Sequence, residues 1–178
     1  LENVMMKKEF KDIITEHLGV EPIMINSSLV SAQNRKRLYW TNIPGVGQPD
    51  DKGILLEDVL EDFVGDKHSE LEKHILSGKT VEKITRHNNR IVKEQSNPDK
   101  SATIHAGYYK MGGRDQQYLI DREPEVFRKL TPVECERLQT LPDNYTEGIS
   151  NTQRYKALGN GWTVDVIVHI LQGLKWQS

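Results

Sequence analysis

The pair of residues in this sequence best suited to binding an anion is Arg35 and Arg37, in the stretch SAQNRKRLYWTN, residues 31–42. Alternate side chains of an extended segment point the same way, so both guanidinium groups should project from one face of a strand. Each planar guanidinium can donate paired hydrogen bonds to a phosphate or bind a carbonyl oxygen. The apolar residues 38–40 should be buried in a sheet, and Lys36 should face solvent. A solvated basic turn is the alternative.

A glycine turn near the C-terminus is a second candidate for ligand contact. The stretch GNGWT, residues 159–163, stands directly before an apolar pattern with helical spacing. Such a turn brings backbone N–H groups close to a ligand, and here it also brings the Asn160 amide. Trp162 would offer a flat apolar wall beside them. The other interpretation is a plain turn at the start of a helix, with Trp162 in the core.

The stretch HAGYYKMGGRDQQY, residues 105–118, has the composition of a surface that reads DNA. It combines adjacent aromatic residues, glycines, cations and amides. In the major groove arginine pairs with guanine and glutamine with adenine, whereas lysine binds phosphate. We therefore expect Arg114, Gln116 and Gln117 to contact bases and Lys110 to contact the backbone. An ordinary polar loop is the alternative for each of them.

The elements that must position these residues alternate between helix and strand. Residues 7–18 should form a helix with an apolar face, closed by Gly19. Residues 21–30 and 37–45 should form two strands that pair like a hairpin. This alternation predicts an α/β fold.

The middle of the chain carries weaker patterns. A short acidic helix is expected over residues 54–63, and another helix over 68–78, ending at its glycine. Residues 83–120 are polar and rich in turn signals, which predicts short strands and loops.

Helical order should return after residue 130. Thr131 is the expected N-cap, Pro132 occupies the first helical position, and Glu134 completes a capping box. A last helix should follow the glycine turn. Its expected apolar face consists of Val164, Ile167, Val168 and Leu171.

Composition restricts the class of protein. The chain has 178 residues, 36% hydrophobic and 28% charged, which allows one ordinary domain or two small ones with a modest core. Seven acids and one base lie within residues 50–66, and seven bases with two acids lie within 83–114. The basic stretch is either a surface for a polyanion or an ordinary solvated face. The histidines lack metal-ligand spacing, so no metal site is expected, and no apolar run reaches membrane-spanning length.

Four short strings, in this order, resemble the DNA (cytosine-5) methyltransferase family. They are LENV at residues 1–4, QNRKR at 33–37, RKLTPVECERLQTLPDNY at 128–145 and ALGNGWTVDVIVHIL at 157–171. Each string alone is a weak signal, whereas four in the order of the family are strong together. The insert between the second and third strings falls where the family keeps its target recognition domain.

The resemblance implies a fold and a division of the chain. Residues 1–45 would form the C-terminal edge of a doubly wound S-adenosylmethionine-dependent methyltransferase sheet. Residues 46–127 would form a small mixed target recognition lobe, and 128–178 a C-terminal helical segment that returns to the catalytic domain. The implied substrate is double-stranded DNA, and the implied cofactor is S-adenosyl-L-methionine.

The resemblance also implies roles for individual residues. Glu2 would act on N3 and the exocyclic amine of cytosine during attack at C6. Arg35 and Arg37 would serve the flipped base or its backbone. The residues that would line the methyl donor are Asn160, Gly161 and Trp162.

Two family features are missing from the 178 residues, namely the Pro-Cys nucleophile and the glycine-rich cofactor loop. The one cysteine, Cys135, stands between Glu134 and Glu136, and neighbouring acids raise a thiol pKa. We therefore interpret Cys135 as a packing residue. The isolated chain should be inactive and should need an N-terminal catalytic half of the same enzyme.

Several alternatives remain open at this level. The chain could be a non-catalytic DNA-binding module or a remnant of such an enzyme. It could also be an α/β fragment whose basic stretch is only surface. For the methyltransferase interpretation we expect a cytoplasmic protein of bacterial or phage origin, acting in restriction-modification.

Overall fold

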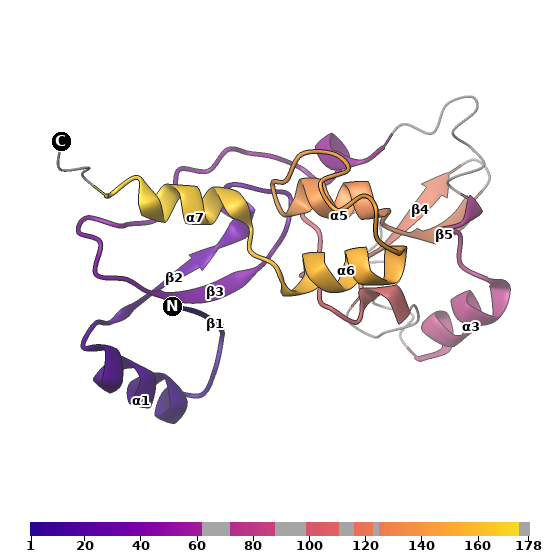
Figure 1. Ribbon diagram of the computed structural model, residues 1–178. Helices are drawn as coiled ribbons and strands as arrows, with labels where there is room; N and C mark the ends of the chain where they lie inside the picture. The colour runs from indigo at the N-terminus through magenta and orange to yellow at the C-terminus, as the bar shows by residue number, and fades with distance from the viewer. Residues whose placement is uncertain (62–71, 88–98, 111–115, 123–124, 175–178) are drawn as a thin grey trace.

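The computed structural model contains two neighbouring groups of elements, one built on a three-stranded sheet and one on helices and a hairpin (Figure 1). It describes residues 1–61, 72–87, 99–110, 116–122 and 125–174. No helix within these ranges combines the length and the apolar character that a membrane crossing requires.

The sheet consists of β1 (Glu2–Val4), β2 (Pro22–Asn26) and β3 (Lys36–Trp40). The middle strand, β3, pairs antiparallel with both neighbours. The predicted hairpin-like pairing of the second and third strands is therefore confirmed. Within the described part of the chain β1 has a paired neighbour on one side only, so its other edge is open.

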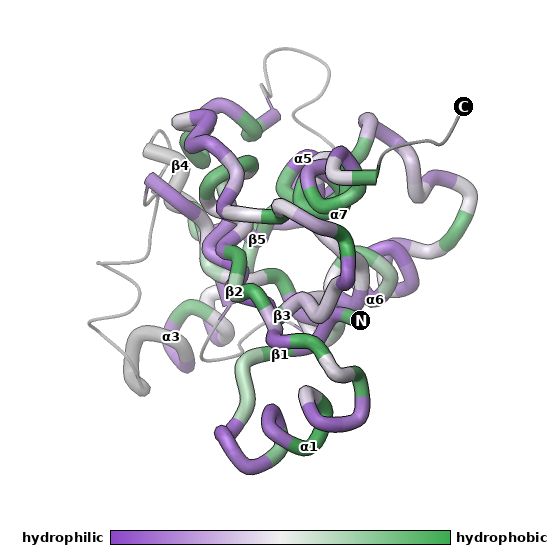
Figure 2. The backbone as a smooth tube through the Cα atoms, turned by 90° about the vertical axis from the view of Figure 1, so that its left-hand side faces the viewer, coloured by the Kyte–Doolittle hydropathy of each residue, from purple (hydrophilic) through white to green (hydrophobic). Residues whose placement is uncertain are grey.

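Helix α1 (Lys8–Leu18) follows β1 and ends as predicted. Gly19 adopts the left-handed conformation, with φ of 66°, and its N–H donates to the Thr15 carbonyl at 2.8 Å. No residue of α1 is buried, however, and Phe10 and Ile13 are 54% and 53% exposed. The helix lies at the periphery (Figure 2), and its apolar face stays exposed in the described part of the chain.

Helix α7 (Val164–Leu171) packs against the sheet (Figure 1). Its buried side chains are Val166 and Ile170, and they join the core cluster of the sheet. The predicted apolar face is wrong in part, because Val168 and Leu171 are 47% and 48% exposed. The sequence VDVIVHIL is apolar on more than one side, so spacing alone could not identify the buried side.

The second group of elements surrounds a larger core. Its regular elements are α3 (Gly78–His87), β4 (Tyr118–Arg122), β5 (Glu125–Lys129), α5 (Pro132–Leu138) and α6 (Asn151–Asn160), with the 3-10 turns η2 (Glu57–Val59) and η4 (Tyr108–Lys110). The 3-10 turn η1 (Ser27–Leu29) follows β2, and Leu29 packs against the core cluster of the sheet. β4 and β5 form an antiparallel hairpin. α5 and α6 pack in one cluster with residues from the middle of the chain, including Leu56, Ile104 and Leu119. The three-part division of the chain stays a prediction.

The start of α5 is as predicted. Thr131 is its N-cap and accepts from the Glu134 N–H at 3.1 Å, while the Glu134 carboxylate accepts from the Thr131 N–H at 2.8 Å. Glu134 also pairs with Arg128 at 2.8 Å, and both side chains are buried. This buried ion pair thus links the capping box to the core.

Other expectations for the middle of the chain are wrong. Within the described residues of 54–63 only η2 is helical, and residues 62 and 63 lie outside the description. The predicted helix over 68–78 lies partly outside it, and Gly78 begins α3 rather than ending a helix. Helix α6 was not predicted, although Ser150 and Gln153 have capping-box spacing, and the Ser150 side chain accepts from the Gln153 N–H.

Candidate active site

The most defined polar pair at the sheet is Glu2 on β1 with Arg37 on β3. Arg37 Nε lies 3.0 Å from Glu2 Oε1, and the two side chains are 20% (Glu2) and 14% (Arg37) exposed. Arg37 Nη1 also donates to the Lys36 carbonyl at 2.9 Å. Because antiparallel strands bring β1 beside β3, residues 35 positions apart meet on the face of the sheet that also carries Tyr39. A carboxylate oriented by a guanidinium in this way can act on a proton of a bound ligand.

Tyr39 lies directly opposite Glu2 in the strand register. Burial, followed by the negative charge of Glu2, raises the pKa of Tyr39 to about 12. The phenol therefore stays neutral, and Glu2 and Arg37 are the ionic groups at this place.

Arg35 corrects the prediction that two arginine forks project together. Arg35 directly precedes β3, two positions before Arg37, so alternation of the extended chain puts both side chains on one face. Yet Arg35 is only 4% exposed, and Nη1 donates to the Ile104 carbonyl at 2.9 Å. Nη2 donates to the carbonyls of Gly161 at 2.9 Å and Gly159 at 3.3 Å.

The physical reason is the C-terminal end of α6. Helix carbonyls there have no partner within the helix, and a guanidinium satisfies them at close range. Burial, with the charge of Arg37 second, lowers the pKa of Arg35 to about 10, so the group still carries its charge at neutral pH. Arg35 therefore joins the strand, the 104 region and the glycine turn, whereas Lys36 is exposed as predicted.

The predicted ligand turn lies between two helices. Asn160 is the last residue of α6, Gly161 is extended, and Thr163 precedes α7. Trp162 is 54% exposed, which excludes its interpretation as a core residue. Through the bond from Arg35 to Gly161, this turn is joined to the side of β3 that carries Arg37.

Gly159 is required by packing. A Cβ atom at this position would lie 2.2 Å from the carbonyl carbon of His105 and 2.3 Å from the Ala106 nitrogen. Only glycine allows α6 to approach that backbone so closely. Gly159 thus serves helix packing, a role that the sequence interpretation had not given it.

The predicted base contacts at Gln116 and Gln117 are wrong. These side chains are 3% and 2% exposed. Gln116 Nε2 donates to the Gly107 carbonyl at 3.1 Å, and Gln117 Oε1 accepts from the Ala102 N–H at 3.0 Å. Backbone groups in a buried loop outside a β-sheet need other hydrogen-bond partners, and these two side-chain amides supply them.

The basic residues differ in what they face. Lys110 is exposed at the end of η4, with Nζ 5.8 Å from the Tyr109 ring centroid, and Lys156 of α6 approaches the same ring at 5.4 Å. Lys100 instead donates to three backbone carbonyls, so it does not belong to a polyanion surface. Arg114 lies outside the described residues. The position of Lys156 beside Tyr109 had no signal in the sequence.

Cys135 is the packing residue that was predicted. It is fully buried in the core of the second group. Burial, and after it the charge of Glu134, raises the pKa of its thiol well above the usual range. A protonated, inaccessible thiol cannot act as a nucleophile. The described residues also contain no group of three potential metal ligands.

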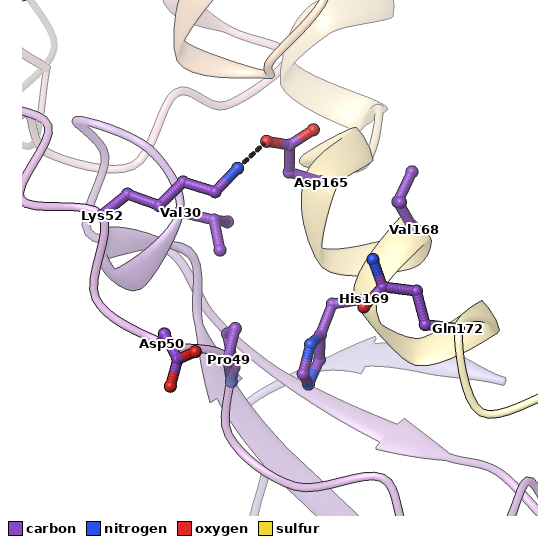
Figure 3. Close-up of a pocket in the computed structure, with 8 residues that line it drawn as sticks. All are labelled: Val30, Pro49, Asp50, Lys52, Asp165, Val168, His169 and Gln172. Carbon is purple, nitrogen blue, oxygen red and sulfur yellow. Dashed lines mark hydrogen bonds and ion pairs between the residues drawn. The ribbon is translucent and has the colours of Figure 1, made fainter.

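A polar pocket of about 240 Å³ lies between α7 and the chain that follows β3 (Figure 3). It is lined by Val30, Pro49, Asp50, Lys52, Asp165, Val168, His169 and Gln172. Lys52 Nζ pairs with Asp165 at 2.6 Å across it, and His169 Nε2 is bonded to the Gly47 carbonyl at 3.0 Å. These bonds hold α7 against residues 47–52, and none of the predicted site residues lines this pocket.

Comparison with known proteins gives one family. A family model of C-5 cytosine-specific DNA methylase matches residues 5–176. Type II methyltransferase M.NlaX of Neisseria lactamica is 40% identical over 73 residues, which is 41% of this chain and 22% of that protein. Type II methyltransferase M.Sau3AI of Staphylococcus aureus is 49% identical over 45 residues, 25% of this chain and 11% of that protein. The matches thus span less than a quarter of the length of these relatives.

Solved structures share the fold. The Entamoeba histolytica methyltransferase EhMeth has a TM-score of 0.67 at 18% identity, covering 98% of this chain and 62% of that one. A mutant of Spodoptera frugiperda DNMT2 has a TM-score of 0.68 at 18% identity, covering 97% of this chain and 64% of that one. At such identity the likeness concerns the mixed α/β fold alone.

Proposed function

Because the chain belongs to the C-5 cytosine-specific DNA methylase family, we propose that it is the C-terminal portion of an enzyme that methylates C5 of cytosine in double-stranded DNA. In this proposal it supplies DNA recognition and part of the active site. The observation that carries the proposal is the contact of 3.0 Å between Arg37 and Glu2, whose side chains both stay partly exposed.

The proposed chemistry follows from the electronic demand of cytosine. Attack at C6 moves negative charge toward N3, so a protonated carboxyl group that donates to N3 and accepts from the exocyclic amine lowers the barrier. Glu2 is the proposed carboxyl group, and Arg37 orients it and binds the flipped base. Arg35 acts indirectly in this proposal, because its hydrogen bonds hold the backbone at Ile104 and Gly161 in place beside β3.

The turn at residues 160–162 is the proposed part of the methyl-donor site in this chain. Trp162 and Asn160 are exposed there, so an aromatic face and an amide are available to a ligand with an adenine ring and polar groups. S-adenosylmethionine supplies the methyl group when it is bound. A Cβ atom at Gly161, between these two residues, would lie 3.1 Å from the Ala157 carbonyl oxygen.

The nucleophile must come from elsewhere in this proposal, because Cys135 is buried and the chain has no Pro-Cys pair. We propose an N-terminal catalytic half of the same enzyme, carrying the Pro-Cys pair and the glycine-rich loop. The open edge of β1 and the exposed apolar face of α1 support this partner. An apolar helix face without a cover is a common sign of a missing contact.

The test is a methylation assay with tritiated S-adenosylmethionine and DNA of mixed sequence. The isolated chain should transfer no label, and addition of the N-terminal half should restore transfer. Glu2→Gln in the reassembled protein should abolish most of it, while Lys36→Gln, at an exposed position, serves as the matched control. Label in DNA from the isolated chain would overturn the proposal that the nucleophile comes from an N-terminal half.

A non-catalytic DNA-binding module is the second candidate, and the buried state of the one cysteine favours it. The same assay separates the two. Binding of DNA without methyl transfer after reassembly would support the module. The relatives named Type II methyltransferases support a role in restriction-modification for the enzyme.

A further inference from the structure

The end of α5 holds the turn between α6 and α7 by a single buried side chain. Gln139 is 1% exposed, and its Nε2 donates to the Leu158 carbonyl at 2.6 Å and to the Gly161 carbonyl at 3.5 Å. Its Oε1 accepts from Thr163 Oγ1 at 2.9 Å. One amide group thus contacts the last turn of one helix and the N-cap residue of the next.

The next residue caps α7 from outside that helix. The Val164 N–H donates to the Gln139 carbonyl at 3.0 Å, and the Asp165 N–H donates to Thr140 Oγ1 at 2.9 Å. Thr163, which holds the N-cap position, makes no side-chain cap of its own. The first N–H groups of a helix need such acceptors, so α7 begins where the end of α5 places it.

Thr140 adopts an unfavourable backbone conformation to do this. Its φ is +55°, which is rare for a β-branched residue and costs free energy. The surrounding contacts must compensate for that cost. The hydroxyl of Thr140, through its bond to the Asp165 N–H, is one of these contacts.

The opposite side of the turn is held by the segment before β3. Arg35 donates to the Gly161 carbonyl at 2.9 Å. Gln33, which is fully buried, donates to the Leu138 carbonyl at 3.2 Å and accepts from the Ile104 N–H at 2.8 Å. The strand that carries Arg37 and the end of α5 are thereby bonded to one another and to the same turn.

We propose that Gln139 and Thr140 are positioning residues for the methyl donor. They hold the turn of Gly161 and Trp162 at a set place relative to Arg35, and hence to Arg37 and Glu2. This inference rests on the proposed function of that turn. Preorganised contacts bind a ligand more tightly, because the ordering cost is met before binding.

The first test is hydrogen exchange of the 178-residue chain. Gln139→Met keeps the length of the side chain and removes its bonds, Thr140→Gly removes the hydroxyl and the backbone strain, and Thr140→Ser keeps the hydroxyl. Amides 164 and 165 should exchange on the order of tenfold faster in Gln139→Met and Thr140→Gly, and within about twofold of wild type in Thr140→Ser. Gln116→Met, which removes another buried amide, should leave these two amides unchanged.

Thr140→Gly separates positioning from general stability. Relief of the positive φ should keep the urea midpoint of the whole chain near that of wild type. Faster exchange confined to the turn is then a local effect. Unchanged exchange at residues 164 and 165, or equal acceleration over the whole chain, would overturn the inference.

The second test is the dissociation constant of the methyl donor for the chain reassembled with its N-terminal half. It should rise about tenfold in Gln139→Met and Thr140→Gly, with DNA affinity within about twofold of wild type. An unchanged donor constant despite faster exchange would refute a role toward the donor. Absence of donor binding by the wild-type assembly would instead overturn the proposed function itself.

Discussion

Two arginines of the same strand region differ in role because their partners differ. The Arg37 side chain is paired with a carboxylate and stays partly open to solvent, whereas that of Arg35 is enclosed by the backbone carbonyls of Ile104, Gly159 and Gly161. Removing the first should affect chemistry, and removing the second should affect the assembly of the site.

The first prediction concerns Arg37. In the reassembled enzyme Arg37→Ala should lower the methylation rate on the order of 100-fold, because a preorganised donor at the reacting base is lost. The ranking of DNA targets should not change, since every target shares the flipped cytosine. Arg37→Lys should restore only part of the rate, because an ammonium group lacks the planar fork.

Rates on the preferred site and on each single-base variant test this. Arg114→Ala provides the contrast, because we predict a base contact worth about 1–3 kcal/mol for that residue. Arg114→Ala should instead reduce the difference in rate between the preferred site and its single-base variants. A changed ranking with Arg37→Ala, or a common factor on all sites with Arg114→Ala, would mean that the two roles are reversed.

The second prediction concerns Glu136, whose carboxylate is buried and accepts from the N–H groups of Asn144 and Thr146 and from Arg154. Burial alone would raise the pKa of Glu136, but the hydrogen bonds from Thr146 and Arg154 outweigh it and lower the pKa from 4.5. A lowered pKa means that the carboxylate stabilises the fold above pH 4.5. This contribution should be lost as the pH falls through the lowered value.

Glu136→Gln should therefore destabilise the chain by about 1–3 kcal/mol at pH 7. The difference from wild type should shrink in acid, once the wild-type carboxyl group is protonated. Urea denaturation at pH 7 and at decreasing pH measures both effects. A difference that stays constant across this range would exclude the carboxylate as the source of the stability.

At the scale of elements, helix positions are set by contacts at helix ends. α6 lies against the backbone at residues 105 and 106 because Gly159 has no side chain, and α7 begins at the bonds from Gln139 and Thr140. The amphipathic pattern of a helix predicts that one side is buried. In α6 and α7 the contacts at the helix ends fix the orientation of the helix, and so which side is buried.

The third prediction follows from the packing of α6. Gly159→Ala should destabilise the chain by roughly 1–3 kcal/mol or more, because the added Cβ would meet backbone that cannot move aside easily. Gly47→Ala is the matched control, since its Cβ would have no atom within 4 Å. Its effect should stay within about 0.5 kcal/mol. Equal urea midpoints for both variants would contradict the close approach.

At the scale of the whole molecule, the two groups of elements are joined by two cations, the partly buried Lys100 and the buried Arg35. Lys100 donates to the carbonyls of Ser28, Ser31 and Ile54, and Arg35 binds Ile104 and Gly161. The N–H groups of both cations donate to carbonyl groups of the protein itself. The cations available to DNA are therefore fewer than the basic stretch of the sequence indicates.

The fourth prediction concerns DNA binding by the isolated chain. Binding should be weak, and the affinity should fall on the order of tenfold to a thousandfold between low and physiological salt. Lys110→Gln, at an exposed position, should lower the salt slope by about 1. Lys100→Gln should lower stability and leave the slope unchanged. A fluorescence titration measures the slope, and a flat response would show that the cations do not face phosphate.

Much of the local structure was predictable from sequence. The pairing of β2 with β3, the end of α1 at Gly19 and the capping box at Thr131 were predicted and are present. Each depends on residues a few positions apart, or on one alternating pattern, so the information lies within a short stretch. The burial of Cys135 was predictable for the same reason, because its helix and its acidic neighbours are local.

The family, and with it the choice of Glu2 and Arg37 as site residues, also came from short strings of residues, whereas their contact is seen only in the structure. The hydrogen-bond partners of Arg35, Gln116 and Gln117 could not be predicted from such strings. A guanidinium or an amide binds a protein carbonyl as readily as a phosphate or a base, and its residue type does not distinguish these partners. Only the tertiary structure, which brings Ile104 and Gly161 to Arg35 from 69 and 126 positions away, decided between them.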